Sequence, residues 1–65
     1  MYKNYKVVSP CKLVLEDVFT GQKETVEFIY GQIVEGRVDL VGSKTMLTLS
    51  SGLGGIISSE AFAEI

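Results

Sequence analysis

Few residues of this 65-residue chain carry side chains suited to covalent or acid–base chemistry. The sequence contains no histidine and only one cysteine, Cys11. A cysteine nucleophile needs a neighbouring base that forms its thiolate, and histidine is the usual base. We therefore predict that Cys11 is a small apolar residue of the core. A zinc site needs about four ligands, most often from cysteine and histidine, so we expect no metal and no other cofactor.

The acidic residues offer candidate catalytic pairs, among them Glu16 with Asp17 and Glu24 with Glu27. Paired carboxylates in glycosidases work inside a substrate cleft, where one of the two is desolvated. On a strand, Glu24 and Glu27 face opposite sides, and the other pair stands beside a predicted turn. We interpret all four as solvated surface residues. The sequence therefore predicts a protein that is not an enzyme.

A third candidate site is the glycine-rich segment Ser51-Gly52-Leu53-Gly54-Gly55. Phosphate-binding loops hold an anion on backbone N–H groups at a helix N-terminus. A P-loop also needs Lys and Ser or Thr after its last glycine, and a dinucleotide fingerprint needs a further glycine inside a βαβ unit. Neither pattern is present. We interpret the segment as a flexible connection between two strands.

The elements around these residues have the alternation of strands. Two apolar rows, at positions 11, 13 and 15 and at positions 26, 28 and 30, are joined by the turn Thr20-Gly21-Gln22. This pattern predicts a β-hairpin with Cys11, Leu13 and Leu15 on its inner face.

The second half of the chain predicts further strands. Residues 32–41 form a long strand in which Gly36 indicates a bulge or a sharp bend. Gly42-Ser43 predicts a tight hairpin to a strand at residues 44–50. Ser58 or Ser59 can cap a short helical turn through residues 60–64. Turn signals about every ten residues are typical of an all-β domain, which we assign to residues 1–65.

Two segments resemble small SH3-like β-barrel modules of phage virion and accessory proteins. They are Gly31-Gln32-Ile33-Val34-Glu35-Gly36-Arg37-Val38 and Gly55-Ile56-Ile57-Ser58-Ser59-Glu60. The resemblance implies an SH3-like barrel or a curled antiparallel meander of about five strands, with a short C-terminal helical turn. It also implies a structural role in a virion, as a capsid or decoration-type component.

The charge of the chain argues against binding to nucleic acid. The formal net charge is −2, whereas duplex binding requires clustered Lys and Arg that neutralise phosphates. The first twelve residues are nevertheless basic and aromatic. The alternative hypothesis is a small nucleic-acid-binding regulator that uses Tyr2, Lys3, Tyr5, Lys6 and Lys12.

Chain length favours association as the source of extra stability. A core of this size supplies only about 3–5 kcal/mol, and small domains usually add disulfides, a metal or oligomerisation. We therefore predict a non-catalytic structural subunit that contacts itself or other subunits of a protein assembly. The predicted partner-binding residues are Tyr2, Tyr5, Lys6, Leu53, Phe62 and Ile65.

The chain has no apolar stretch of membrane-spanning length, so we expect no association with a membrane. Its first six residues are mostly polar and do not resemble a signal peptide, so we expect the protein to be synthesised inside the cell.

Overall fold

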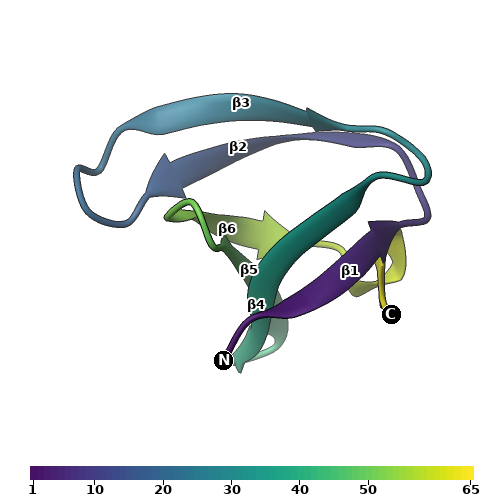
Figure 1. Cartoon of the computed structure of the whole chain (residues 1–65). Helices are drawn as coiled ribbons and strands as arrows, with labels where there is room; N and C mark the ends of the chain where they lie inside the picture. The colour runs from purple at the N-terminus through teal and green to yellow at the C-terminus, as the bar shows by residue number, and fades with distance from the viewer.

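The chain folds into one antiparallel sheet of seven strands, which curls strongly without closing (Figure 1). The computed structural model describes all 65 residues. The strand order is β3-β2-β6-β5-β4-β1-β7. The predicted all-β class is confirmed, but the strands number seven where about five were expected, and β3 and β7 are open edges. The strands are β1 (Lys3–Val7), β2 (Cys11–Asp17), β3 (Lys23–Phe28), β4 (Ile33–Val41), β5 (Lys44–Leu49), β6 (Leu53–Ile57) and β7 (Phe62–Glu64).

The predicted hairpin of the first half is confirmed as β2 and β3, which pair from Cys11↔Phe28 to Glu16↔Lys23. Leu15 and Phe28 are fully buried on the inner face. Cys11 is half-buried, and it packs against the core as the alternation predicted.

The second predicted hairpin is also confirmed, because Gly42 and Ser43 alone separate β4 from β5. Gly42 has φ +65° and Ser43 does not have positive φ, which is the pattern of a type II′ turn. Within β4, Gly36 pairs with Lys3 of β1 on one side and with Leu49 of β5 on the other. The register continues without an extra residue, so Gly36 is not a bulge. The strand itself is curved (Figure 1).

The glycine-rich segment is mostly strand, and our interpretation of it as a flexible connection is wrong. Only residues 50–52 form a turn, and β6 begins at Leu53. Gly55 lies opposite Leu47 of β5, and a Cβ on Gly55 would lie 2.7 Å from Cδ2 of Leu15. This strand therefore uses glycine where core side chains of its neighbours need the space.

The C-terminal helical turn is also corrected. A single 3-10 turn covers Ser59–Ala61, and Ser58 makes no side-chain capping bond. The chain then extends as β7, where Phe62 lies opposite Val7 of β1. Pairing with β1 satisfies the backbone of these residues, and it points Phe62 into the core, which so short a helix could not do alone.

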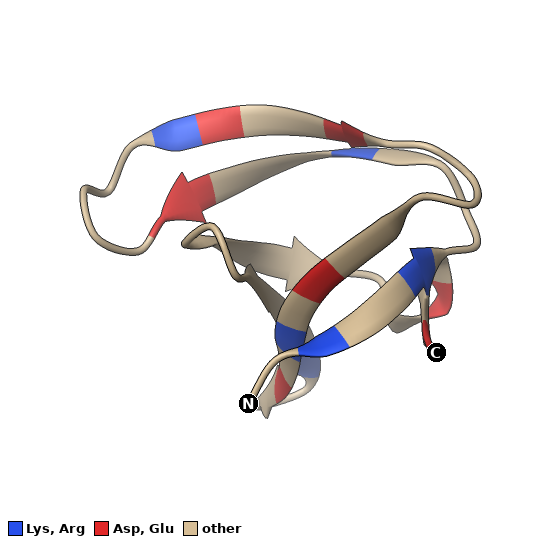
Figure 2. Cartoon of the chain, viewed as in Figure 1, with Lys and Arg blue, Asp and Glu red and all other residues tan.

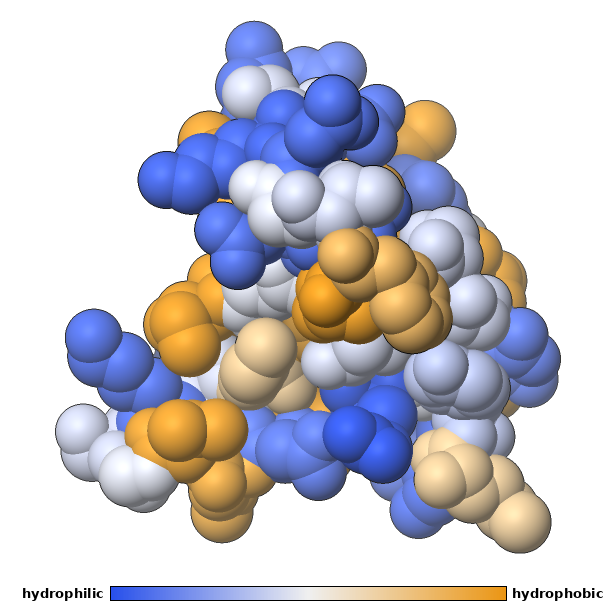
Figure 3. All heavy atoms as spheres, turned by 90° about the vertical axis from the view of Figure 1, so that its left-hand side faces the viewer, coloured by the Kyte–Doolittle hydropathy of each residue, from blue (hydrophilic) through white to orange (hydrophobic).

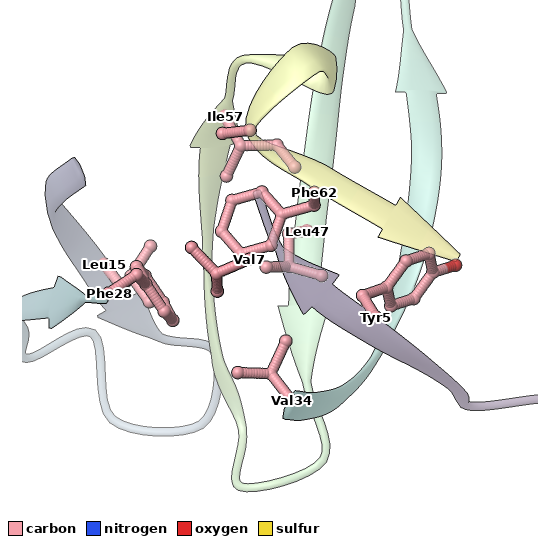
Figure 4. Packing of buried hydrophobic residues seen from close by; sticks show 9 residues of the cluster. Tyr5, Val7, Leu15, Phe28, Val34, Leu47, Ile57 and Phe62 are labelled. Carbon is pink, nitrogen blue, oxygen red and sulfur yellow. The ribbon is translucent and has the colours of Figure 1, made fainter. Parts of the chain in front are cut away.

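The core fills the space that the curled sheet encloses (Figure 4). Nine residues form it: Tyr5, Val7, Leu15, Phe28, Val34, Leu47, Ile57, Ala61 and Phe62. The rings of Phe28 and Phe62 meet edge to face, with centroids 5.2 Å apart. Because these residues belong to β3 and β7, this contact brings the two ends of the sheet together over the core.

Candidate interaction surfaces

The six predicted partner-binding residues divide between the core and the surface. Tyr5 and Phe62 are each only 8% exposed and belong to the core. Alternation along β1 and β7 points both inward, so the chain itself covers them and they are not available as surface contacts. Tyr2 and Ile65 are exposed, and Lys6 and Leu53 are half-buried. For these four residues the predicted role remains a prediction.

Lys6 and Ile65 contribute to one continuous surface, which we call the outer face of β1. Lys6 has two cross-strand neighbours, Ile33 of β4 and Ala63 of β7. Ile65 continues the same side of β7 two residues beyond Ala63, and its N–H donates to the carbonyl of Asn4. The outer face of β1 consists of Lys6, Tyr30, Ile33, Ala63 and Ile65.

A cation–π contact organises the centre of this surface. The Nζ of Lys6 lies 5.4 Å from the centroid of the Tyr30 ring. Tyr30, Ile33 and Ile65 are 66%, 54% and 71% exposed. The ammonium group orders the ring while leaving most of it open to solvent.

The sequence pattern did not indicate Tyr30 and Ile33 as surface contacts. Alternation placed Tyr30 on the inner row with Val26 and Phe28, but β3 ends at Phe28. Gln32 then closes a turn: its N–H donates to the carbonyl of Ile29, and its Oε1 accepts the N–H of Ile29. This turn directs Tyr30 outward. The signal was present in Gly31, whose positive φ of 86° ends the strand.

A second apolar patch lies where the β2–β3 and β5–β6 turns meet. Phe19 is 86% exposed and Val18 is 52% exposed. The N–H of Val18 donates to the carbonyl of Gly52, and Leu53 pairs with Asp17. Figure 3 views the molecule from this end, where apolar side chains gather in separate patches among hydrophilic ones. Leu53, predicted from sequence as a contact, packs against the core next to these turns.

Asp17 holds the β2–β3 turn in shape. Its Oδ1 accepts the N–H groups of Phe19 and Thr20 at 2.8 and 3.2 Å. We expect Asp17→Ala to lower the free energy of unfolding by about 1–2 kcal/mol, because both donors lose a charged acceptor. Thermal unfolding followed by circular dichroism measures this loss. Asp17→Asn is the matched control: it keeps an oxygen acceptor and should lose less, whereas equal losses would contradict this role for the oxygen.

The charged residues, which include the acidic residues considered as catalytic pairs, are dispersed over the sheet (Figure 2). Glu16 lies opposite Lys23, and Glu27 lies opposite Lys12. The structure contains no group of three or more ligand side chains placed to hold a metal ion, and no enclosed pocket. None of its helical segments has the length and apolar character needed to cross a bilayer.

The residues of the nucleic-acid alternative are not gathered on one surface. Tyr5 is buried, Lys12 faces Glu27 across the hairpin, and Nζ of Lys3 lies 3.5 Å from Oε1 of Glu64. Stacking on bases needs exposed rings beside free cations. This placement does not favour the alternative.

No protein-family model, curated protein or solved structure matches the chain.

Proposed function

We propose that this protein is a non-catalytic structural subunit that associates with itself or with other subunits of a larger protein assembly. The observation that carries the proposal is the outer face of β1, where Tyr30, Ile33 and Ile65 are each more than half exposed around Lys6. Isolated exposed apolar residues are ordinary, but neighbouring ones that form a patch indicate an interaction site.

The composition of this surface supports the proposal. Burial of apolar surface stabilises an interface by about 25 cal/mol per Å². Tyrosine is among the residues that dominate binding energy, because its ring gives a large contact area with few rotatable bonds. Contact with Lys6 reduces the freedom that Tyr30 would lose on binding.

Two finer proposals come from the resemblance to SH3-like modules. The strongly curled antiparallel sheet supports an SH3-like assignment of the fold. The phage virion and accessory proteins that the two segments resemble then favour a virion as the assembly. Under this proposal the chain is made inside the cell and acts as a capsid or decoration-type component.

Replacing the apolar side chains of the outer face of β1 tests the proposal. We expect the purified protein to have a mass above the 7.1 kDa of one chain in light scattering at millimolar concentration. The double variant Tyr30→Ser and Ile33→Thr should associate at least tenfold more weakly, because it removes the aromatic and one aliphatic contact.

Leu40→Thr is the matched control. Leu40 is 80% exposed and lies on β4, the strand of Ile33, but near the opposite end of that strand. This variant should associate like the parent protein. A parent protein that stays at the mass of one chain throughout, or equal losses for the two variants, would overturn the proposed role of this surface.

A further inference from the structure

The outer edge of β3 carries an uninterrupted row of free backbone groups. β3 is the last strand at one end of the sheet and pairs with β2 alone. The N–H of Asp17 donates to the carbonyl of Gln22. This bond shows which residues of the β2–β3 ladder form hydrogen-bonded pairs. Since bonding alternates along an antiparallel strand, the even-numbered residues bond to β2. The N–H and C=O groups of Lys23, Thr25 and Glu27 therefore point away from the sheet.

This free row has a defined end. Beyond Glu27, the next outward-pointing residue is Ile29, whose N–H and C=O are both bonded to Gln32. The edge therefore offers three N–H donors and three C=O acceptors, and a strand that pairs with it must match these three residues.

A second copy of the same strand matches them in one register. Two identical strands that pair antiparallel about a two-fold axis place one residue opposite its own counterpart. With Thr25 opposite Thr25, Lys23 lies opposite Glu27 of the second copy on both sides of the axis. All free groups of residues 23, 25 and 27 then bond in pairs. Moving the axis by one residue toward Lys23 places Glu24 opposite Glu24. Moving it by one residue toward Glu27 places Lys23 opposite Ile29, whose backbone groups are already bonded.

The neighbouring strand extends this charge complementarity. Within the chain, Glu16 is the cross-strand neighbour of Lys23, and Lys12 is that of Glu27 (Figure 2). Across the two copies, the outer face would read Glu16, Lys23, then Glu27 and Lys12 of the second copy, so the sign alternates at each step. Opposite charges directly across a ladder stabilise it, whereas like charges destabilise it.

The uncharged side chains at the centre of this pairing also fit against one another. Val14, the cross-strand neighbour of Thr25, is 63% exposed. The pairing would place the two threonines side by side, flanked by Val14 of each copy, and β-branched neighbours of this kind pack well on a sheet.

We propose that β3 pairs with β3 of a second copy of this chain, with Thr25 opposite Thr25, so that the two sheets become continuous. This inference deepens the proposed function by naming one partner of the assembly. It uses a different surface from the outer face of β1, so each of the two proposals can fail while the other stands.

Complementary charge variants test the pairing. The background is the chain with Tyr30→Ser and Ile33→Thr, so that the outer face of β1 does not contribute. Lys23→Glu makes the edge wholly acidic, and Glu27→Lys makes it basic at both positions. Each variant alone should dimerise about tenfold more weakly, because two attractive pairs become repulsive. An equimolar mixture should return to the mass of two chains, since each acidic residue then faces a lysine.

The result is read by light scattering at millimolar concentration. Unmixed variants that dimerise as strongly as the background chain, no recovery in the mixture, or a background chain that stays monomeric would each overturn the pairing. Thr25→Pro provides a second test, because it removes an outward N–H that makes no bond to β2, a position where edge strands accept proline. It should abolish dimers while leaving the thermal unfolding midpoint nearly unchanged, and persistent dimers of the folded variant would contradict the proposal.

Discussion

Phe28→Ala should leave the chain largely unfolded at room temperature. Phe28 is 1% exposed, and its ring contacts Phe62 edge to face. Truncation of a buried phenylalanine costs about 3–5 kcal/mol, which is as much as a core of this size supplies. The contact also joins the two ends of the sheet, so no neighbouring strand can close the cavity. Circular dichroism should show loss of the β signal, and amide NMR should show loss of peak dispersion.

Phe19→Ala is the matched control for this variant. It removes the same ring, but Phe19 is 86% exposed at the β2–β3 turn. Its free energy of unfolding, obtained from the unfolding midpoint, should lie within about 0.5 kcal/mol of that of the parent. A folded Phe28→Ala protein as stable as Phe19→Ala would show that the two edge strands do not depend on each other.

The second large effect is expected for Gly36→Ala. A Cβ on Gly36 would lie 2.7 Å from the backbone oxygen of Thr48 and 3.3 Å from the Cα of Leu49. Backbone atoms of a paired strand cannot move aside as a side chain can, so β4 and β5 must separate. Overpacking of this kind costs about 1–3 kcal/mol. In a chain this short, each kcal/mol lowers the unfolding midpoint by about 4–8 °C, which thermal unfolding measures directly.

Gly54→Ala supplies the comparison, since it introduces the same methyl group in a neighbouring region of the sheet. Its nearest neighbours would lie 3.4 Å away, so only slight adjustment is required. We expect its free energy of unfolding to change by less than about 1 kcal/mol. If the two alanine variants unfold at the same temperature, then the close approach of β4 and β5 at Gly36 is not a constraint on the fold.

The sequence predicted those elements whose side chains alternate in the ordinary way. The hairpin of β2 and β3 follows from two apolar rows and a glycine turn, and the hairpin at Gly42 follows from local turn chemistry. β6 was missed because Gly54 and Gly55 have no side chains to show an alternation. Its glycines are explained only by neighbours distant in sequence, such as Leu15 and Leu47.

The candidate surface was only partly predictable for a similar reason. Lys6 and Ile65 were identified from the basic, aromatic start and the apolar end of the chain. Ile33 belongs to this surface because β1 pairs with β4, which is a contact between segments far apart in sequence. Tyr30 belongs to it because Gln32 closes a turn that directs the tyrosine outward. Tyr5 and Phe62 were expected at the surface because local sequence does not reveal that β7 pairs with β1.

Amide NMR spectra recorded from micromolar to millimolar concentration test the central claim, that this chain associates through its exposed surfaces. We predict that the amide peaks of Lys6, Tyr30, Ile33 and Ala63 shift together as concentration rises, with those of Lys23, Thr25 and Glu27 forming a second set. Peaks of the exposed residue Leu40 should stay in place. Spectra that do not change over the whole range would contradict the account, and so would shifts confined to Leu40 and its neighbours.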